Sequence, residues 1–199
     1  TSTLQITMVQ KVIIVHGWGG NSVNCWFPWL KKELESKGIK VIVPEMPHAE
    51  MPVISKWIKK LEETIKSLDK DTFFIGHSIG CQTIMRYLEK QPEKTKIGGA
   101  LFVAGWFNLT DLEENEISIA NPWINTSINF NKIKSMLNNL TVLLSSNEPY
   151  GYVNENAKAF KEQLGAKVII LKNRGHFADD DNCFELPEAL KEIISLIAS

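Results

Sequence analysis

The chain has 199 residues, of which 44% are hydrophobic, and this length favours a single domain over residues 1–199 with one buried core. The charges almost balance, with 22 Lys and Arg against 23 Asp and Glu, so nothing in them points to nucleic acid or to a membrane surface as a partner. No apolar run approaches the roughly 18 residues of a membrane-spanning helix. The three cysteines lack the spacing of metal ligands, and we expect them to be free thiols in a reducing cytoplasm.

Short apolar runs alternate with stretches of helical spacing from one end of the chain to the other. We expect residues 1–10 to be a loose N-terminal extension, because the first run begins at Val12. In chain order, the predicted elements are a strand at 12–15, a helix at 27–37, a strand at 41–43, a helix at 54–68, a strand at 72–75, a helix that ends before Pro92, strands at 100–103 and 141–144, a helix at 155–164, a strand at 168–171 and a helix from Pro187.

This alternation predicts an α/β fold with a mostly parallel sheet of about six strands and helices on both faces. Near-continuous apolar strands separated by helices are typical of such sheets. Their ligands bind beyond the carboxyl ends of the strands, which is where this chain keeps its Gly, His, Ser and acidic residues. The longest irregular stretch, residues 105–131, follows the fourth strand and is expected to form part of a pocket wall.

The strongest local signal is the G-x-S-x-G pattern formed by Gly76, Ser78 and Gly80. With Gly and Ser each near 7% of residues, chance gives about 0.07 matches in a chain of this length. The pattern follows a predicted strand and opens a helix, which is the setting of a nucleophile elbow. Ser78 is therefore the candidate nucleophile. The alternative is that Ser78 only caps the helix and the glycines only turn the chain.

A serine hydroxyl needs an adjacent base, and His has the right intrinsic pKa for that role. Of the four histidines, His176 lies after the last strand and before the last helix, which matches the Ser, acid, His order of α/β-hydrolases. His77 lies inside the elbow, where its side chain should point away from that of Ser78. We expect His16 to shape the loop after the first strand, and His48 to be structural.

The acid of such a site should follow the fifth strand. Glu148 is the only carboxylate in the loop 145–150, and Glu can take the place of Asp beside the histidine. Asp111, in the loop after the fourth strand, is the main alternative, and Glu148 would then be a solvated loop residue. Residues 179–181 are all Asp, and we interpret them as an exposed acidic turn instead of a metal site.

Two backbone donors are needed for an oxyanion hole. The amide of Ile79, directly after the nucleophile, is one candidate, and the amide of Trp18 in the glycine-rich loop 16–20 is the other. The alternative for this loop is a plain turn. The sequence has no G-x-G-x-x-G, P-loop or H-E-x-x-H pattern, so we expect no cofactor and no metal.

Aromatic residues gather in the predicted loops around this site. We expect Trp26, Trp106 and Tyr150 to contact the substrate, although for any single aromatic residue a place in the core is the alternative. Such a set favours a small apolar acyl or aromatic group over a highly charged substrate. The whole set is Trp18, Trp26, Trp106, Phe107, Trp123, Tyr150 and Tyr152.

The sequence resembles the small serine hydrolases of the retinoblastoma-binding-protein-9 type, including their bacterial relatives. The resemblance runs from Val12 to the C-terminal helix. Its most specific pieces are His16-Gly17, Cys25-Trp26-Phe27-Pro28-Trp29-Leu30-Lys31-Lys32, Pro44-Glu45-Met46-Pro47, Gly76-His77-Ser78-Ile79-Gly80-Cys81, Met85-Arg86-Tyr87 and Gly175-His176-Phe177.

This resemblance implies a compact α/β-hydrolase fold without a large lid, and a Ser-Asp-His triad in which Ser78 and His176 match directly. The family's Asp lies in a Ser-x-Asp-Asp-x loop, and here Glu148 falls at that position. The Leu-x-Cys-x-Glu motif for binding the retinoblastoma protein is absent, because residues 181–185 lack the Leu. No protein partner is therefore carried over.

Together these features predict a serine hydrolase that cleaves a small ester, thioester or amide through an acyl-enzyme on Ser78. An esterase acting on small acyl substrates is preferred, and a peptidase acting on short peptides is a weaker form of the same hypothesis. The alternative is a binding or regulatory module on a hydrolase fold with vestigial activity, favoured by Glu in place of Asp. A further alternative is acyl transfer to an alcohol or amine instead of water.

Overall fold

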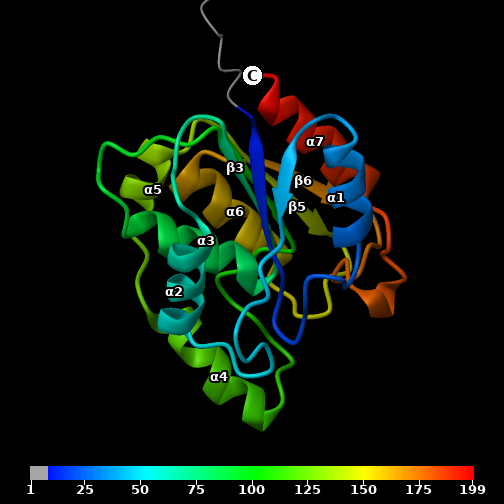
Figure 1. Cartoon of the computed structure of the whole chain (residues 1–199). Helices are drawn as coiled ribbons and strands as arrows, with labels where there is room; N and C mark the ends of the chain where they lie inside the picture. The colour runs from blue at the N-terminus through cyan, green and yellow to red at the C-terminus, as the bar shows by residue number, and fades with distance from the viewer. Residues whose placement is uncertain (1–8) are drawn as a thin grey trace, which may run out of the picture.

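The computed structural model describes residues 9–199, and the expected N-terminal extension at 1–10 falls almost wholly outside this part of the chain. Six strands form one sheet in the order β2-β1-β3-β4-β5-β6, and every neighbouring pair is parallel (Figure 1). The strands are β1 (Lys11–Val15), β2 (Lys40–Ile42), β3 (Thr72–His77), β4 (Gly99–Val103), β5 (Leu140–Ser145) and β6 (Lys167–Leu171). The predicted parallel sheet is confirmed.

Helices cover both faces of this sheet. Strand side chains alternate between the two, so Ile13 and Phe74 enter one apolar layer while Ile14 and Ile75 enter the other. Figure 1 shows α1 (Phe27–Glu35) and α7 (Pro187–Ile197) over one face. Helices α2 (Ile54–Thr64), α3 (Ile79–Glu89), α5 (Phe130–Met136) and α6 (Val153–Leu164) lie over the other. No helix of residues 9–199 is both long and apolar enough to cross a bilayer.

The strand order places a functional site at one particular edge. The chain moves outward from β1 to β2 and then returns to β3 on the other side of β1. Such a reversal opens a crevice beyond the carboxyl ends of β1 and β3. Ser78 follows β3 directly, and the loops after β4, β5 and β6 reach the same edge because all six strands are parallel.

The stretch 105–131 is not irregular as expected, because it contains helix α4 (Glu114–Asn125) and the start of α5. At the start of α4, the side chain of Glu116 accepts from the amide of Glu113, and the amide of Glu116 donates to the backbone carbonyl oxygen of Glu113. Only Ala120 and Trp123 of this helix are buried, so no apolar period marked it in the sequence. The helix lies at the carboxyl edge of the sheet (Figure 1).

Candidate active site

The turn between β3 and α3 holds Ser78 in a conformation that few residues adopt, with φ 55° and ψ −123°. The glycines on either side make the turn possible. A Cβ on Gly76 would lie 2.7 Å from the amide nitrogen of Cys81, and one on Gly80 would lie 2.8 Å from the carbonyl oxygen of His16 and closer still to that of Val15. Helix α3 therefore approaches β1 as closely as a nucleophile elbow requires.

Ser78 lines a cavity of about 500 Å³ at the carboxyl edge of the sheet. Its side chain is buried, with 6% of the residue exposed, and its Oγ accepts a hydrogen bond from the indole nitrogen of Trp106 over 3.2 Å. The loop after β1 lies against it, since a Cβ on Gly17 would be 3.3 Å from Cβ of Ser78. The predicted nucleophile thus lies at the bottom of a cleft.

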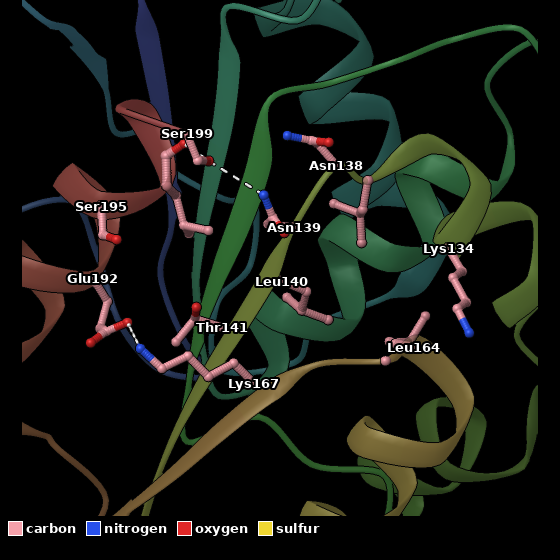
Figure 2. A pocket seen from close by; sticks show the side chains of 13 residues that line it. Lys134, Asn138, Asn139, Leu140, Thr141, Leu164, Lys167, Glu192, Ser195 and Ser199 are labelled. Atoms are coloured by element: carbon pink, nitrogen blue, oxygen red, sulfur yellow. Dashed lines mark hydrogen bonds and ion pairs between the residues drawn. The ribbon is translucent and has the colours of Figure 1, made fainter.

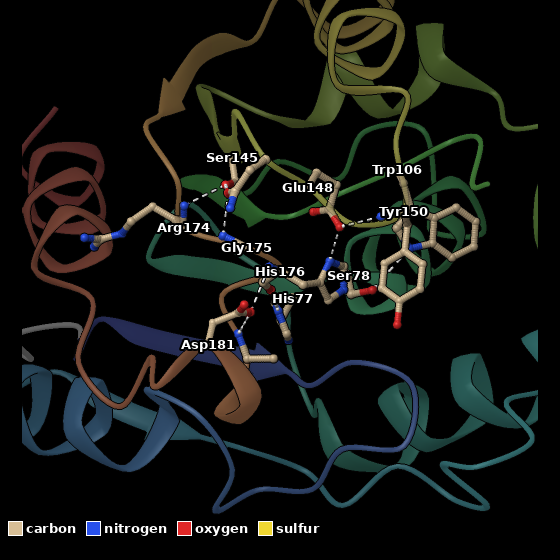
Figure 3. Close-up of polar contacts among 12 residues, drawn as sticks. His77, Ser78, Trp106, Ser145, Glu148, Tyr150, Arg174, Gly175, His176 and Asp181 are labelled. Atoms are coloured by element: carbon tan, nitrogen blue, oxygen red, sulfur yellow. Dashed lines mark hydrogen bonds and ion pairs between the residues drawn. The ribbon is translucent and has the colours of Figure 1, made fainter. Parts of the chain in front are cut away.

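His176 lines the same cleft, and its side chain meets that of Glu148 behind it (Figure 3). Nδ1 of His176, in the loop after β6, lies 2.8 Å from Oε1 of Glu148, in the loop after β5. An ionised carboxylate can only accept, so Nδ1 carries the proton and Nε2 is left to take one. Asp111, the alternative acid, is an exposed residue, and the carboxylate beside His176 belongs to Glu148.

The loop that carries His176 is fixed by side chains from the end of β5. The amide of Arg174 donates to Oγ of Ser145, and the amide of Gly175 donates to Oδ1 of Asn147, each over 2.8 Å (Figure 3). Beyond the histidine, Asp181 accepts from the amide of His176 over 2.8 Å. The acidic turn, which the sequence predicts to be exposed and without a metal, is largely exposed, yet it also braces this loop. No metal-binding cluster is found among residues 9–199.

His77 contacts the backbone of His176. Its Nε2 lies 2.8 Å from the carbonyl oxygen of His176, while its ring packs edge-on against Trp26 and Phe27. Burial, together with the nearby His176, lowers the pKa of His77 to about 3. The neutral ring therefore donates through Nε2 to the loop that carries His176.

His16 shapes the loop that carries Trp18. Its Nε2 accepts from the amide of Met46 over 3.0 Å, so the proton is on Nδ1, which donates to the carbonyl oxygen of Gly17 over 2.9 Å. Burial lowers the pKa of His16, which keeps this tautomer neutral. A neutral histidine thus ties the loop after β1 to the loop after β2.

The two residues expected to supply oxyanion donors lie at the cleft or next to Ser78. Ile79 is the first residue of α3, and Trp18 lines the cavity, where its indole donates to the carbonyl oxygen of Glu50. Within residues 9–199, neither of the two backbone amides has a protein acceptor. A helix N-terminus with a free amide favours a negative oxygen beside it.

The three aromatic residues expected to contact substrate separate into two groups. Trp106 and Tyr150 line the cavity, and the ring of Tyr150 packs edge-on against His176. The expectation for Trp26 is wrong, because it is fully buried and does not line the cavity. Its indole donates to the carbonyl oxygen of Phe177, and its ring lies in the apolar layer beneath α1 and α7, so it is a core residue.

Negative charge surrounds the mouth of the cavity, a feature that the sequence did not indicate. Four carboxylates from three separate segments line it, and no Lys or Arg is among the lining residues. Burial raises the pKa of the Tyr150 phenol, and nearby carboxylates raise it further. The four lining carboxylates are Glu50, Glu116, Asp179 and Asp180.

A second cavity, of about 440 Å³, opens at the opposite edge of the sheet (Figure 2). Residues from the starts of β5 and β6 line it together with the end of α7, and an ion pair between Lys167 and Glu192 spans 2.7 Å at one side. It contains Ser195 and Ser199 but no histidine. The cleft around Ser78 is therefore the candidate active site.

The sequence model of the family described as Serine hydrolase matches residues 12–194, which include every residue that lines the cleft. The chain belongs to the serine hydrolase family. This serine hydrolase is 27% identical to the hydrolase YdeN of Bacillus subtilis over 183 residues, which cover 90% of this chain and 92% of that one. It is 28% identical to Serine hydrolase RBBP9 of Rattus norvegicus over 192 residues, 93% of this chain and 96% of that one.

Solved structures agree with this membership. The crystal structure of YdeN from B. subtilis superposes with a TM-score of 0.87 at 26% identity, covering 96% of this chain and all of that one. Est1E from Butyrivibrio proteoclasticus shares the fold, with a TM-score of 0.70 at 17% identity and coverage of 96% and 89%. The serine hydrolase therefore has the predicted α/β-hydrolase fold.

The buried histidines predict an acid-sensitive fold. The pKa of His77 is about 3 in the folded protein and about 6.5 in an unfolded chain, so the unfolded state binds more protons between these values. Its contribution to stability is complete above about pH 6.5 and is lost as the pH falls towards 3, at up to about 1.4 kcal/mol per pH unit. His16 acts in the same direction.

Urea unfolding between pH 4 and 7 measures this dependence. A His77→Gln variant keeps a donor for the carbonyl of His176 but cannot titrate, so its stability should fall less steeply over the same range. An equal slope in both proteins would show that His77 is not the group responsible.

Proposed function

We propose that this chain is an esterase that cleaves small acyl esters through an acyl-enzyme on Ser78. The contact between Nδ1 of His176 and Oε1 of Glu148 carries the proposal, because it orients a histidine that lines the same cleft as a serine in a sharp strand-to-helix turn. Ser78, His176 and Glu148 would form the triad, in the chain order that α/β-hydrolases use.

In the first half-reaction, Oγ of Ser78 attacks the substrate carbonyl carbon while Nε2 of His176 takes its proton. The carbonyl oxygen becomes an oxyanion, for which the amides of Ile79 and Trp18 are the proposed donors. Glu148 holds the imidazole and stabilises the imidazolium that forms. The bond to the leaving group then breaks, and the leaving oxygen takes the proton from Nε2.

In the second half-reaction, a water molecule replaces the departed alcohol. His176 takes one proton from this water as its oxygen attacks the acyl carbon. The bond from that carbon to Oγ breaks, the acid is released, and Ser78 recovers its proton from His176. The protein returns to its starting state, and no cofactor is required by this scheme.

Reaction with a fluorophosphonate probe tests the proposal, because such a probe modifies an activated serine. We expect stoichiometric labelling of the folded protein, with the added mass on the peptide that contains Ser78, together with turnover of p-nitrophenyl butyrate. Labelling of a different serine would reject the assignment of the nucleophile. A folded protein that is neither labelled nor active on esters would favour the binding or regulatory module instead.

The preference for an ester over a peptide rests on the cleft. Activated esters need little assistance to the leaving group, and the lining residues Leu109 and Leu112 offer apolar surface to a small acyl chain. Comparing the rates at which the protein hydrolyses an ester and an amide with the same acyl group tests this preference.

We also propose a cytoplasmic location, which the small and odd set of cysteines predicts.

The charge around the cavity predicts discrimination between esters. Because Glu116 and Asp180 line it without a neighbouring cation, an acyl chain that ends in a carboxylate should be repelled. We expect kcat/KM for p-nitrophenyl hemiglutarate to be roughly tenfold below that for p-nitrophenyl valerate at low salt, with the gap narrowing as salt is added. Equal values for the two esters at low salt would contradict this.

A further inference from the structure

The indole of Trp106 differs from the other hydrogen-bonded indoles of residues 9–199 in what it donates to. Trp106 gives its N–H to Oγ of Ser78, and both residues are nearly inaccessible to water, at 3% and 6% exposed. The remaining hydrogen-bonded indoles, those of Trp18, Trp26, Trp57 and Trp123, all donate to backbone carbonyl oxygens. Such bonds anchor the fold, whereas the bond from Trp106 ends on the reacting atom.

Two buried side chains hold the backbone at Trp106, one at its own carbonyl group and one at the amide of the next residue. Nε2 of Gln82 donates to its carbonyl oxygen over 3.1 Å, and the amide of the next residue, Phe107, donates to Oδ1 of Asn156 over 2.9 Å. Gln82 is 1% exposed and Asn156 is 4% exposed. Buried polar groups are costly unless they are hydrogen-bonded, so these two bonds fix the segment that carries the indole.

Arg86 in turn orients Gln82. Its guanidinium donates twice to Oε1 of Gln82, over 3.1 and 3.2 Å, and also to the carbonyl oxygen of Trp123 over 2.8 Å. Because a guanidinium can only donate, Oε1 of Gln82 must face it, and the amide group Nε2 must face the carbonyl of Trp106. A continuous buried chain thus leads from α4 through α3 to the nucleophile.

An N–H donor at this position has a chemical use that rests on the proposed function. Negative charge develops on Oγ when it loses its proton to His176 during attack, and again when it leaves the acyl carbon during deacylation. A hydrogen bond to an ionised oxygen is about twice as strong as one to a neutral oxygen. The indole nitrogen only donates, so it stabilises that charge without competing for the proton.

We propose that Trp106 is a catalytic residue whose indole N–H stabilises the Ser78 oxygen in both half-reactions. This role differs from that of the oxyanion hole, because its target is the oxygen of the enzyme and not that of the substrate. It also differs from the substrate contact expected for Trp106 from the sequence. A substrate contact would affect binding, whereas a donor to Oγ affects the rate of each chemical step.

The Trp106→Phe variant removes the donor and keeps an aromatic ring. We expect both the second-order rate of fluorophosphonate labelling and the single-turnover rate of deacylation to fall about tenfold or more, with KM for a small ester little changed. Trp57→Phe is the matched control, since it removes an equally buried indole whose acceptor is the carbonyl of Pro47. Trp57→Phe should label at the wild-type rate.

A rise in KM with unchanged labelling and deacylation rates in Trp106→Phe would overturn the proposal and leave the esterase function intact. An inert wild-type protein would overturn both. Should Trp106→Phe fail to fold, the wild type labelled with ¹⁵N-tryptophan gives a second test. The Trp106 indole resonance is assigned with Trp106→Tyr or by elimination. Phosphonylation of Ser78 should shift this resonance more than any other indole resonance. An unmoved resonance would reject the hydrogen bond.

Discussion

Replacing Glu148 by Gln is expected to lower kcat/KM for an activated ester by about 10⁴-fold, the size of effect that amide replacement of a triad carboxylate produces. In the wild type, Oε1 of Glu148 accepts from Nδ1 of His176 over 2.8 Å. An amide can present its NH₂ to Nδ1, which would place the imidazole proton on Nε2 and remove the acceptor that Ser78 needs. An amide also cannot stabilise the imidazolium.

The measurement is steady-state hydrolysis of p-nitrophenyl butyrate by Glu148→Gln, with folding verified by circular dichroism. Glu155→Gln is the matched control, because Glu155 lies outside the cleft in the first turn of α6 and its replacement removes the same charge. Asp111→Asn should retain wild-type activity. If Glu148→Gln were active and Asp111→Asn inactive, the acid would have to be Asp111.

Replacing Gly80 by Ala is expected to destabilise the fold by about 3 kcal/mol or more, although Ala is the better helix former by about 1 kcal/mol. The added methyl group would lie closer than van der Waals contact allows to two backbone carbonyl oxygens, those of Val15 and His16. These oxygens belong to β1 and the loop after it, so neither can rotate away as the end of a side chain would. The helix or the strand must move.

Urea unfolding of Gly80→Ala measures this effect, and loss of fluorophosphonate labelling would show that the elbow moves with it. Gly38→Ala is the control: Gly38 has φ +79° but no atom near its added methyl, so only conformational strain of about 1 kcal/mol applies. A Gly80→Ala protein as stable as the wild type would mean that α3 does not pack against β1 as described.

The sheet and most helices could be predicted from the sequence because their signals are local. Each strand is a short apolar run, and the parallel order follows from their alternation with helices. The positions of Ser78 and His176 also follow from local signals, a G-x-S-x-G turn and a histidine after the last strand. The acid was harder to predict because no motif marks it, but Glu148 is the only carboxylate in the loop 145–150.

Features that depend on contacts between distant segments could not be predicted. Trp26 and Trp106 have similar sequence surroundings, each in a loop with neighbouring aromatic residues, yet one packs beneath α1 and the other donates to Ser78. The acidic mouth of the cavity combines Glu50, Glu116 and Asp179, which are far apart in the chain. Helix α4 was missed because its start is marked by the side chain of Glu116, which accepts from the amide of Glu113, and not by an apolar period.

The division of the cleft between segments has a consequence for how such an enzyme can diversify. Ser78, Glu148 and His176 come from loops anchored to the central sheet, whereas Leu109, Leu112 and Glu116 come from the segment around α4. Changes at residues 109–116 would alter part of the shape and charge that a substrate meets, while Ser78, Glu148 and His176 stay on their own loops. Part of the substrate selectivity can thus change through residues 109–116 alone, separately from the residues that we propose to react.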